Sequence, residues 1–162
     1  MSIIKPNNNT ISAITALPAA ISTGKVLQVV QGTLSSEFNT TSTSYVDTGL
    51  DVSITPTSSS NKILVTCSFS SHNDGSNRTM YYTLYRDSTD LNSGNGSGFF
   101  STYGQSGGGT SAGGNDITFL DSPNTTSQVE YSVYTKVSSG ASYISIHNAI
   151  STITAMEIEA WF

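Results

Sequence analysis

Apolar and polar residues alternate along two neighbouring stretches of the chain between positions 44 and 70. The apolar members are Leu50, Val52 and Ile54 in the first stretch, and Ile63, Val65, Cys67 and Phe69 in the second. A period of two places each apolar set on one face of a β-strand. Pro56 cannot donate to a β-ladder and the polar residues 57–61 suit a turn, so the pattern predicts a hairpin. Its apolar face must be covered, normally by a second sheet.

The same alternation recurs along the rest of the chain. It predicts further strands at 25–34, 79–86, 117–121, 128–137 and 143–147, with turns at 72–77, 87–90, 122–124 and 138–140. In the final strand we expect the core face to hold Met156, Ile158, Ala160 and Phe162, and the solvent face to hold Glu157, Glu159 and Trp161. About eight short strands, spaced roughly ten residues apart, indicate an all-β antiparallel sandwich or barrel.

Residues 1–24 differ from the rest. Their isolated apolar residues have nearly helical spacing: Ile11, Ile14, Leu17 and Ile21. Pro18 would kink or end such a helix. One interpretation is a disordered tail, and the other is an arm whose apolar stripe docks on a partner or on sister subunits. We favour the arm, and expect an attachment segment at 1–24 followed by a β-sandwich domain at 25–162.

Residues 92–116 hold nine of the 14 glycines in the chain. Glycine-rich, uncharged segments are typical of flexible loops. Phe99, Phe100 and Tyr103 predict one short strand within this segment. Because a long loop in a compact domain is usually either functional or disordered, these three aromatic residues are candidates for facing a receptor.

Charge is sparse and acidic. Only 10% of the residues are charged and the net charge is −5, while 29 Ser and 22 Thr supply most of the polar surface. The six basic residues are scattered, whereas binding to nucleic-acid phosphates requires clustered positive charge. An acidic surface also argues against binding to an anionic membrane, and no apolar run approaches the ~20 residues of a membrane span. We therefore expect no nucleic-acid and no membrane partner.

The catalytic groups form no recognisable constellation in the sequence. Cys67 is the only cysteine and lies on an apolar strand face, which predicts a core thiol. Glu157 and Glu159 share the expected solvent face of one strand, whereas glycosidases require two carboxylates that converge across a cleft. His72 and His147 lack the spacing of metal ligands. We therefore expect neither an enzyme nor a bound metal or cofactor.

Several aromatic residues are expected on strand faces opposite the core. They are Tyr81, Tyr85, Tyr134, Tyr143 and Trp161. Single exposed aromatic residues are normal, but several together are typical of a subunit interface or of a surface that stacks on sugars. Because the chain has few charges, we favour packing between subunits in a closed symmetric oligomer.

The opening IIKPNNNT, the segment ALPAA and the following GKVLQVVQ resemble small virion structural proteins of tailed bacteriophages, especially marine phages of cyanobacteria and related hosts. The segments FNTTSTSYVDTGLDVSITPTSSSNKILV at 38–65 and LYRDSTDL at 84–91 are similar to the first jelly-roll hairpin of that group and the residues after it. The resemblance implies a trimeric jelly-roll of the tumour-necrosis-factor or C1q type, preceded by an N-terminal attachment segment. It carries no catalytic residue.

The expected function is therefore that of a non-enzymatic virion protein, a homotrimer displayed on the tail through residues 1–24. Two alternatives remain open. One is a capsid decoration protein that cements neighbouring capsomers. The other is a receptor-binding module that recognises host glycans through the 92–116 loop and the outer tyrosines.

Overall fold

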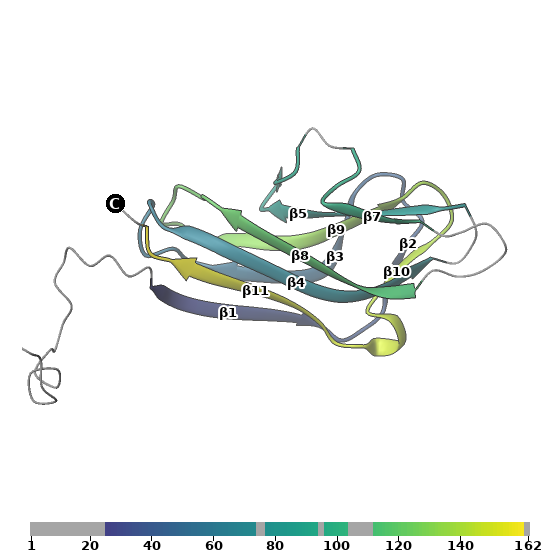
Figure 1. The fold of residues 1–162 in the computed structure, drawn as a ribbon, viewed down its shortest axis with the longest axis horizontal. Coiled ribbons are helices and arrows are strands. Elements are labelled where there is room, and N and C mark those ends of the chain that lie inside the picture. Colours follow the sequence, from purple (N-terminus) through teal and green to yellow (C-terminus); the bar gives the residue numbers. More distant parts are fainter. Residues whose placement is uncertain (1–24, 74–76, 94–95, 104–111, 161–162) are drawn as a thin grey trace, which may run out of the picture.

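The protein is a sandwich of two β-sheets that pack face against face (Figure 1). The computed structural model describes residues 25–73, 77–93, 96–103 and 112–160. The arm residues Ile11, Ile14, Leu17 and Ile21, and the last two residues of the chain, lie outside this part.

Sheet I contains six strands. Its order begins with β1 (Val26–Leu34), β11 (Ser151–Ile158) and β4 (Lys62–Asn73), and continues with β10 (Ser142–Ile144) and β2 (Phe38–Thr40), while β8 (Ala112–Asp121) pairs with the other edge of β4. Sheet II contains five strands. Its order is β3 (Val46–Ile54), β9 (Val129–Val137), β5 (Thr79–Arg86) and β6 (Thr89–Asp90), and β7 (Phe100–Tyr103) also pairs with β5. A short 3-10 helix, η1, spans Ile146–Asn148.

All strand pairs within the two sheets are antiparallel, and the chain repeatedly crosses from one sheet to the other. It passes from β3 to β4, from β4 to β5, from β7 to β8 and from β8 to β9 in this way. This connectivity confirms the predicted jelly-roll-like antiparallel β-sandwich. The inner faces of the two sheets form one hydrophobic core, in which Leu50, Ile63, Tyr82 and Tyr131 are fully buried.

The prediction of a hairpin between positions 44 and 70 is wrong, although its alternation is correct. β3 and β4 do form, and Leu50 and Ile63 point into the core. However, β3 pairs with β9 in sheet II, and β4 pairs with β11 and β8 in sheet I. The two apolar faces therefore cover each other across the sandwich, and residues 55–61 connect the sheets.

The predicted orientation of the final strand is also wrong. Ile153, Ala155 and Glu157 of β11 are buried, whereas Met156 and Ile158 are only partly buried on the outer face. The alternation of charged Glu157 with Met156 and Ile158 predicts that Glu157 faces solvent. In the structure, neighbouring segments supply hydrogen-bond donors to its carboxylate, which allows it to face inward.

Two further boundaries differ from the predictions. β8 begins at Ala112, so the end of the glycine-rich segment belongs to a ten-residue strand instead of a loop. The strand predicted at 143–147 ends at Ile144, because Ser145 and His147 adopt left-handed backbone angles around η1.

Buried polar contacts tie the two sheets together. Arg86 of β5 donates to Asp121 Oδ2 at the end of β8 over 2.7 Å, and the hydroxyl of Tyr131 in β9 donates to the same oxygen over 2.7 Å. Burial and the bond to this carboxylate raise the pKa of Tyr131.

The two sheets also approach closely at the opposite side of the sandwich. Gly32 of β1 lies against the backbone carbonyl of Asp51 in β3, where a Cβ atom would overlap the oxygen.

Candidate subunit interface on sheet II

The outer face of sheet II is built by the alternation of β5 and β9. In β5, Met80, Tyr82 and Leu84 point into the core, so Tyr81 and Tyr85 point outward. β9 alternates in the same way and places Tyr134 and Lys136 on the same outer face. The register brings these outward residues together, because Tyr81 pairs with Lys136 and Thr83 pairs with Tyr134.

The outward aromatic residues contact one another. The rings of Tyr85 and Tyr134 stack with centroids 4.0 Å apart and an angle of 25° between their planes. Lys136 Nζ lies 4.4 Å from the ring centroid of Tyr45 and 5.2 Å from that of Tyr81, in the range of a cation–π contact. We refer to Tyr45, Tyr81, Tyr85, Tyr134 and Lys136 together as the tyrosine face.

Three phenols of this face, those of Tyr45, Tyr85 and Tyr134, have raised pKa values. Burial raises the pKa of Tyr45 to about 12, and the nearby Asp90 carboxylate adds to the effect. Burial and Asp90 also raise the pKa of Tyr85, and burial and Asp47 raise that of Tyr134. The surface is therefore mainly aromatic, with the ammonium group of Lys136 above the rings of Tyr45 and Tyr81 and carboxylates nearby. Such a composition is typical of protein interfaces, which are enriched in Tyr.

Sequence reasoning identified three members of this face and missed Tyr45. Tyr45 precedes β3 within a polar connection, so no alternation marked it. Its hydroxyl is buried beside Gly98 and, among the described residues, has no hydrogen-bond partner. The two remaining candidates do not join the cluster. Tyr143 lies in sheet I, where it stacks on His72 with centroids 4.3 Å apart, and Trp161 lies outside the described residues.

The structure separates the three candidates for the receptor-facing loop. Phe99 and Phe100 pack against the hydrophobic core, Phe99 against Phe119 and Phe100 against Tyr82. Tyr103 is 54% exposed, and its hydroxyl donates to Asn77 Oδ1 over 2.9 Å. Of these three aromatic residues, Tyr103 is therefore the one that presents most of its side chain to solvent.

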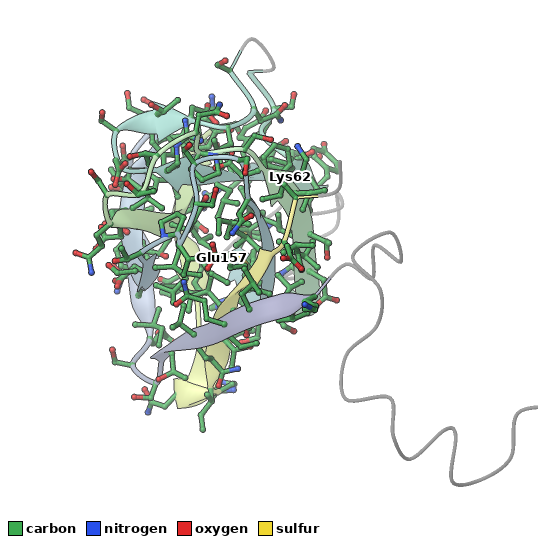
Figure 2. The ribbon with its side chains drawn as sticks, turned by 90° about the vertical axis from the view of Figure 1, so that its left-hand side faces the viewer. Lys62 and Glu157 are labelled. Atoms are coloured by element: carbon green, nitrogen blue, oxygen red, sulfur yellow. The ribbon has the colours of Figure 1, made fainter. Side chains whose placement is uncertain are left out.

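Cys67 and Glu157, two residues with potentially reactive side chains, are buried within the fold. Cys67 is buried in the core, and burial raises the pKa of its thiol to about 12. Glu157 is buried inside the sandwich (Figure 2), not on the solvent face expected from the sequence. Within the described ranges, no three His, Cys, Asp or Glu side chains are grouped as metal ligands, and no helix is long and apolar enough to cross a membrane.

Comparison with known proteins gives no assignment. No protein-family model matches the chain, and neither does any curated protein sequence.

Proposed function

We propose that this chain is a non-enzymatic structural subunit of a bacteriophage virion. In this proposal it is a homotrimeric β-sandwich on the tail, attached through residues 1–24. The observation that carries the proposal is the tyrosine face, where four tyrosines from two strands and the connection before β3 gather on one outer surface. The virion location and the threefold assembly rest on the resemblance of residues 3–10, 16–20, 24–31, 38–65 and 84–91 to phage virion proteins.

The proposal assigns the tyrosine face to contacts between copies of the chain. The Tyr85–Tyr134 stack is already ordered within one subunit, so association would immobilise few additional side-chain rotamers. Large aromatic side chains at the centre of an interface commonly supply most of its binding energy. The three subunits would then present their remaining surfaces to other virion proteins.

The test is the mass of the purified full-length chain under native conditions, compared with two matched variants. Tyr134→Ser removes a member of the tyrosine face, whereas Tyr103→Ser removes an exposed tyrosine elsewhere in sheet II. We expect the wild type and the Tyr103 variant to have a mass that is a multiple of three 17.0 kDa chains, and the Tyr134 variant to lose this threefold assembly. A wild-type monomer, or a threefold assembly that survives in the Tyr134 variant, would contradict the assignment.

Glycan recognition is a second candidate function, favoured by the exposure of Tyr103. An exposed tyrosine ring beside hydrogen-bonding side chains can stack on a sugar. In this case the full-length chain should bind members of a glycan array, and Tyr103→Ala should abolish binding while Tyr134→Ser retains it. A role in capsid decoration is distinguished by the position of the chain in the particle.

A further inference from the structure

The outer face of sheet I carries a continuous apolar row that the proposed function does not use. The row crosses four adjacent strands in register: Val29 of β1 pairs with Met156 of β11, Met156 with Leu64 of β4, and Leu64 with Leu120 of β8. Val29 is 57% exposed and Leu120 is 51% exposed. Contiguous exposed apolar side chains of this kind mark interaction surfaces.

A second row and the strand edge extend this surface. Val26 pairs with Ile158, and Ile158 pairs with Lys62. Leu27 lies at the irregularity in β1 and is 41% exposed. On the other side of the apolar row, the face continues with uncharged residues in register, namely Gln31, Thr154, Thr66 and Thr118.

Charge is almost absent from the outer face of β1, β11, β4 and β8. Its two charged side chains have opposite signs and lie at different levels of the sheet, because Lys62 is opposite Ile158 whereas Asp116 is opposite Ser68. By contrast, the outer face of sheet II carries Asp47, Asp51 and Lys136. Depletion of charge at the centre is typical of protein interfaces.

We propose that this outer face, which we call the sheet I face, binds a second copy of the chain around a twofold axis that crosses the strands. Two copies with a net charge of −5 each approach best through a surface that lacks net charge. A twofold axis across the strands, near the apolar row, brings Lys62 of each copy toward the half of the other face that holds Asp116. The arrangement is therefore complementary to itself in both apolar surface and charge.

The size of the face fits this occupant. Four strands about 4.8 Å apart and roughly nine residues long cover a plane on the order of 600 Å². A stable interface of standard size buries about 800 Å² on each partner, and side chains add to the planar area. The contact uses a surface separate from the tyrosine face, so both contacts can be made by one chain and each can be tested alone.

The experiment is sedimentation velocity of the full-length chain and of variants with charges on either outer face. Leu120→Lys places a charge in the apolar row, and Ser53→Lys makes a matched change at an exposed position of sheet II. We expect Leu120→Lys to halve the mass of the assembly and Ser53→Lys to leave it unchanged. Halving supports the pairing whether the wild type holds two copies or six, so it is independent of the threefold assembly.

Charge exchange tests the orientation of the pair. Lys62→Asp and Asp116→Lys should each weaken pairing about tenfold, and the double variant should restore it, because opposite charges then face each other again. An unchanged mass in Leu120→Lys would overturn the proposal and point to residues 1–24 of the same chain as the cover of this face. A wild type that does not pair would overturn it in favour of a different partner protein, and a double variant weaker than both single variants would overturn the twofold orientation.

Discussion

The side-chain amide of Asn61 donates a 2.6 Å hydrogen bond to the carboxylate of Glu157, and both residues are buried. The same oxygen, Oε1, accepts hydrogen bonds from the backbone N–H and the hydroxyl of Thr57, at 2.7 and 2.8 Å. Gln28 of β1 donates to Oε2 at 2.7 Å. Glu157 therefore joins β1, β11 and the connection between β3 and β4 at one end of the sandwich.

Replacement of Glu157 by Gln should destabilise the fold. The new amide NH₂ would face donors in place of an acceptor oxygen, and a buried donor without an acceptor is costly. We expect Glu157→Gln to lower the free energy of unfolding by about 3 kcal/mol. Glu159→Gln is the matched control, since Glu159 is partly exposed and pairs with Lys25 over 3.9 Å, and it should change stability by less than about 0.5 kcal/mol. Urea denaturation of both variants measures the difference, and equal stabilities would refute a structural role for the buried carboxylate.

The stability of the wild type should fall in acid through this same group. Burial alone would raise the pKa of Glu157, but hydrogen bonds from Asn61, Gln28 and Thr57 outweigh that effect and lower it below 4.5. The folded-state pKa of Glu157 is lower than its unfolded-state pKa. The stability that the ionised carboxylate contributes is therefore fully present above the unfolded-state pKa, and it is lost as pH falls through the folded-state pKa. Between pH 7 and pH 3 the urea midpoint of the wild type should therefore decrease more than that of Glu157→Gln. Parallel pH profiles would show that Glu157 does not titrate in this way.

The contact between β1 and β3 should depend on glycine at position 32. A Cβ atom there would overlap the backbone carbonyl oxygen of Asp51, which cannot move without shifting β3. We expect Gly32→Ala to cost about 1 to 3 kcal/mol, the range for overpacked sites. At Gly114 of β8 a Cβ atom would meet no other atom within 4 Å, so Gly114→Ala should leave stability unchanged or raise it by about 0.5 kcal/mol. Thermal or urea unfolding of the two alanine variants measures the difference between their stabilities. Equal stabilities would show that β1 and β3 can move apart without cost.

Removal of the Tyr45 hydroxyl should stabilise the protein. This buried oxygen has no hydrogen-bond partner among the described residues, so Tyr45→Phe should raise the free energy of unfolding by about 1 kcal/mol at pH 7. Burial raises the folded-state pKa of Tyr45 from 10.0 to about 12, so the phenol ionises in the unfolded state first. The free energy of unfolding of the wild type is unaffected by this ionisation below pH 10 and falls as pH rises toward 12. The advantage of the Phe variant should therefore grow between pH 10 and pH 12. A less stable Phe variant at pH 7 would show that the hydroxyl is bonded.

The sequence predicted the orientation of strands better than their partners. Alternation placed Leu50 and Ile63 in the core correctly, because a period of two depends only on local geometry. Pairing depends on contacts between distant segments, and the short connection between β3 and β4 wrongly suggested a hairpin. The inward orientation of Glu157 was hidden for the same reason, since its donors Gln28 and Asn61 are far away in the sequence.

The candidate interface was predicted in part. Tyr81, Tyr85 and Tyr134 were placed on an outer face because they alternate with core residues along their strands, and the structure brings them together. Tyr45 could not be found in this way, because it lies before β3 in a connection without periodicity. The apolar row on sheet I was also missed, because Val29, Met156, Leu64 and Leu120 become neighbours only through the register of four strands.

The most direct test of the central claim is electron cryomicroscopy of the intact bacteriophage particles in which we propose that this chain is assembled. The proposed function requires the chain to be a virion component, with its tyrosine face in contact with a neighbouring copy and residues 1–24 bound to another virion protein. We expect density for three copies of the β-sandwich around one axis at the tail. Purified particles that lack the chain, or density in which the tyrosine face is exposed to solvent in every copy, would contradict the account.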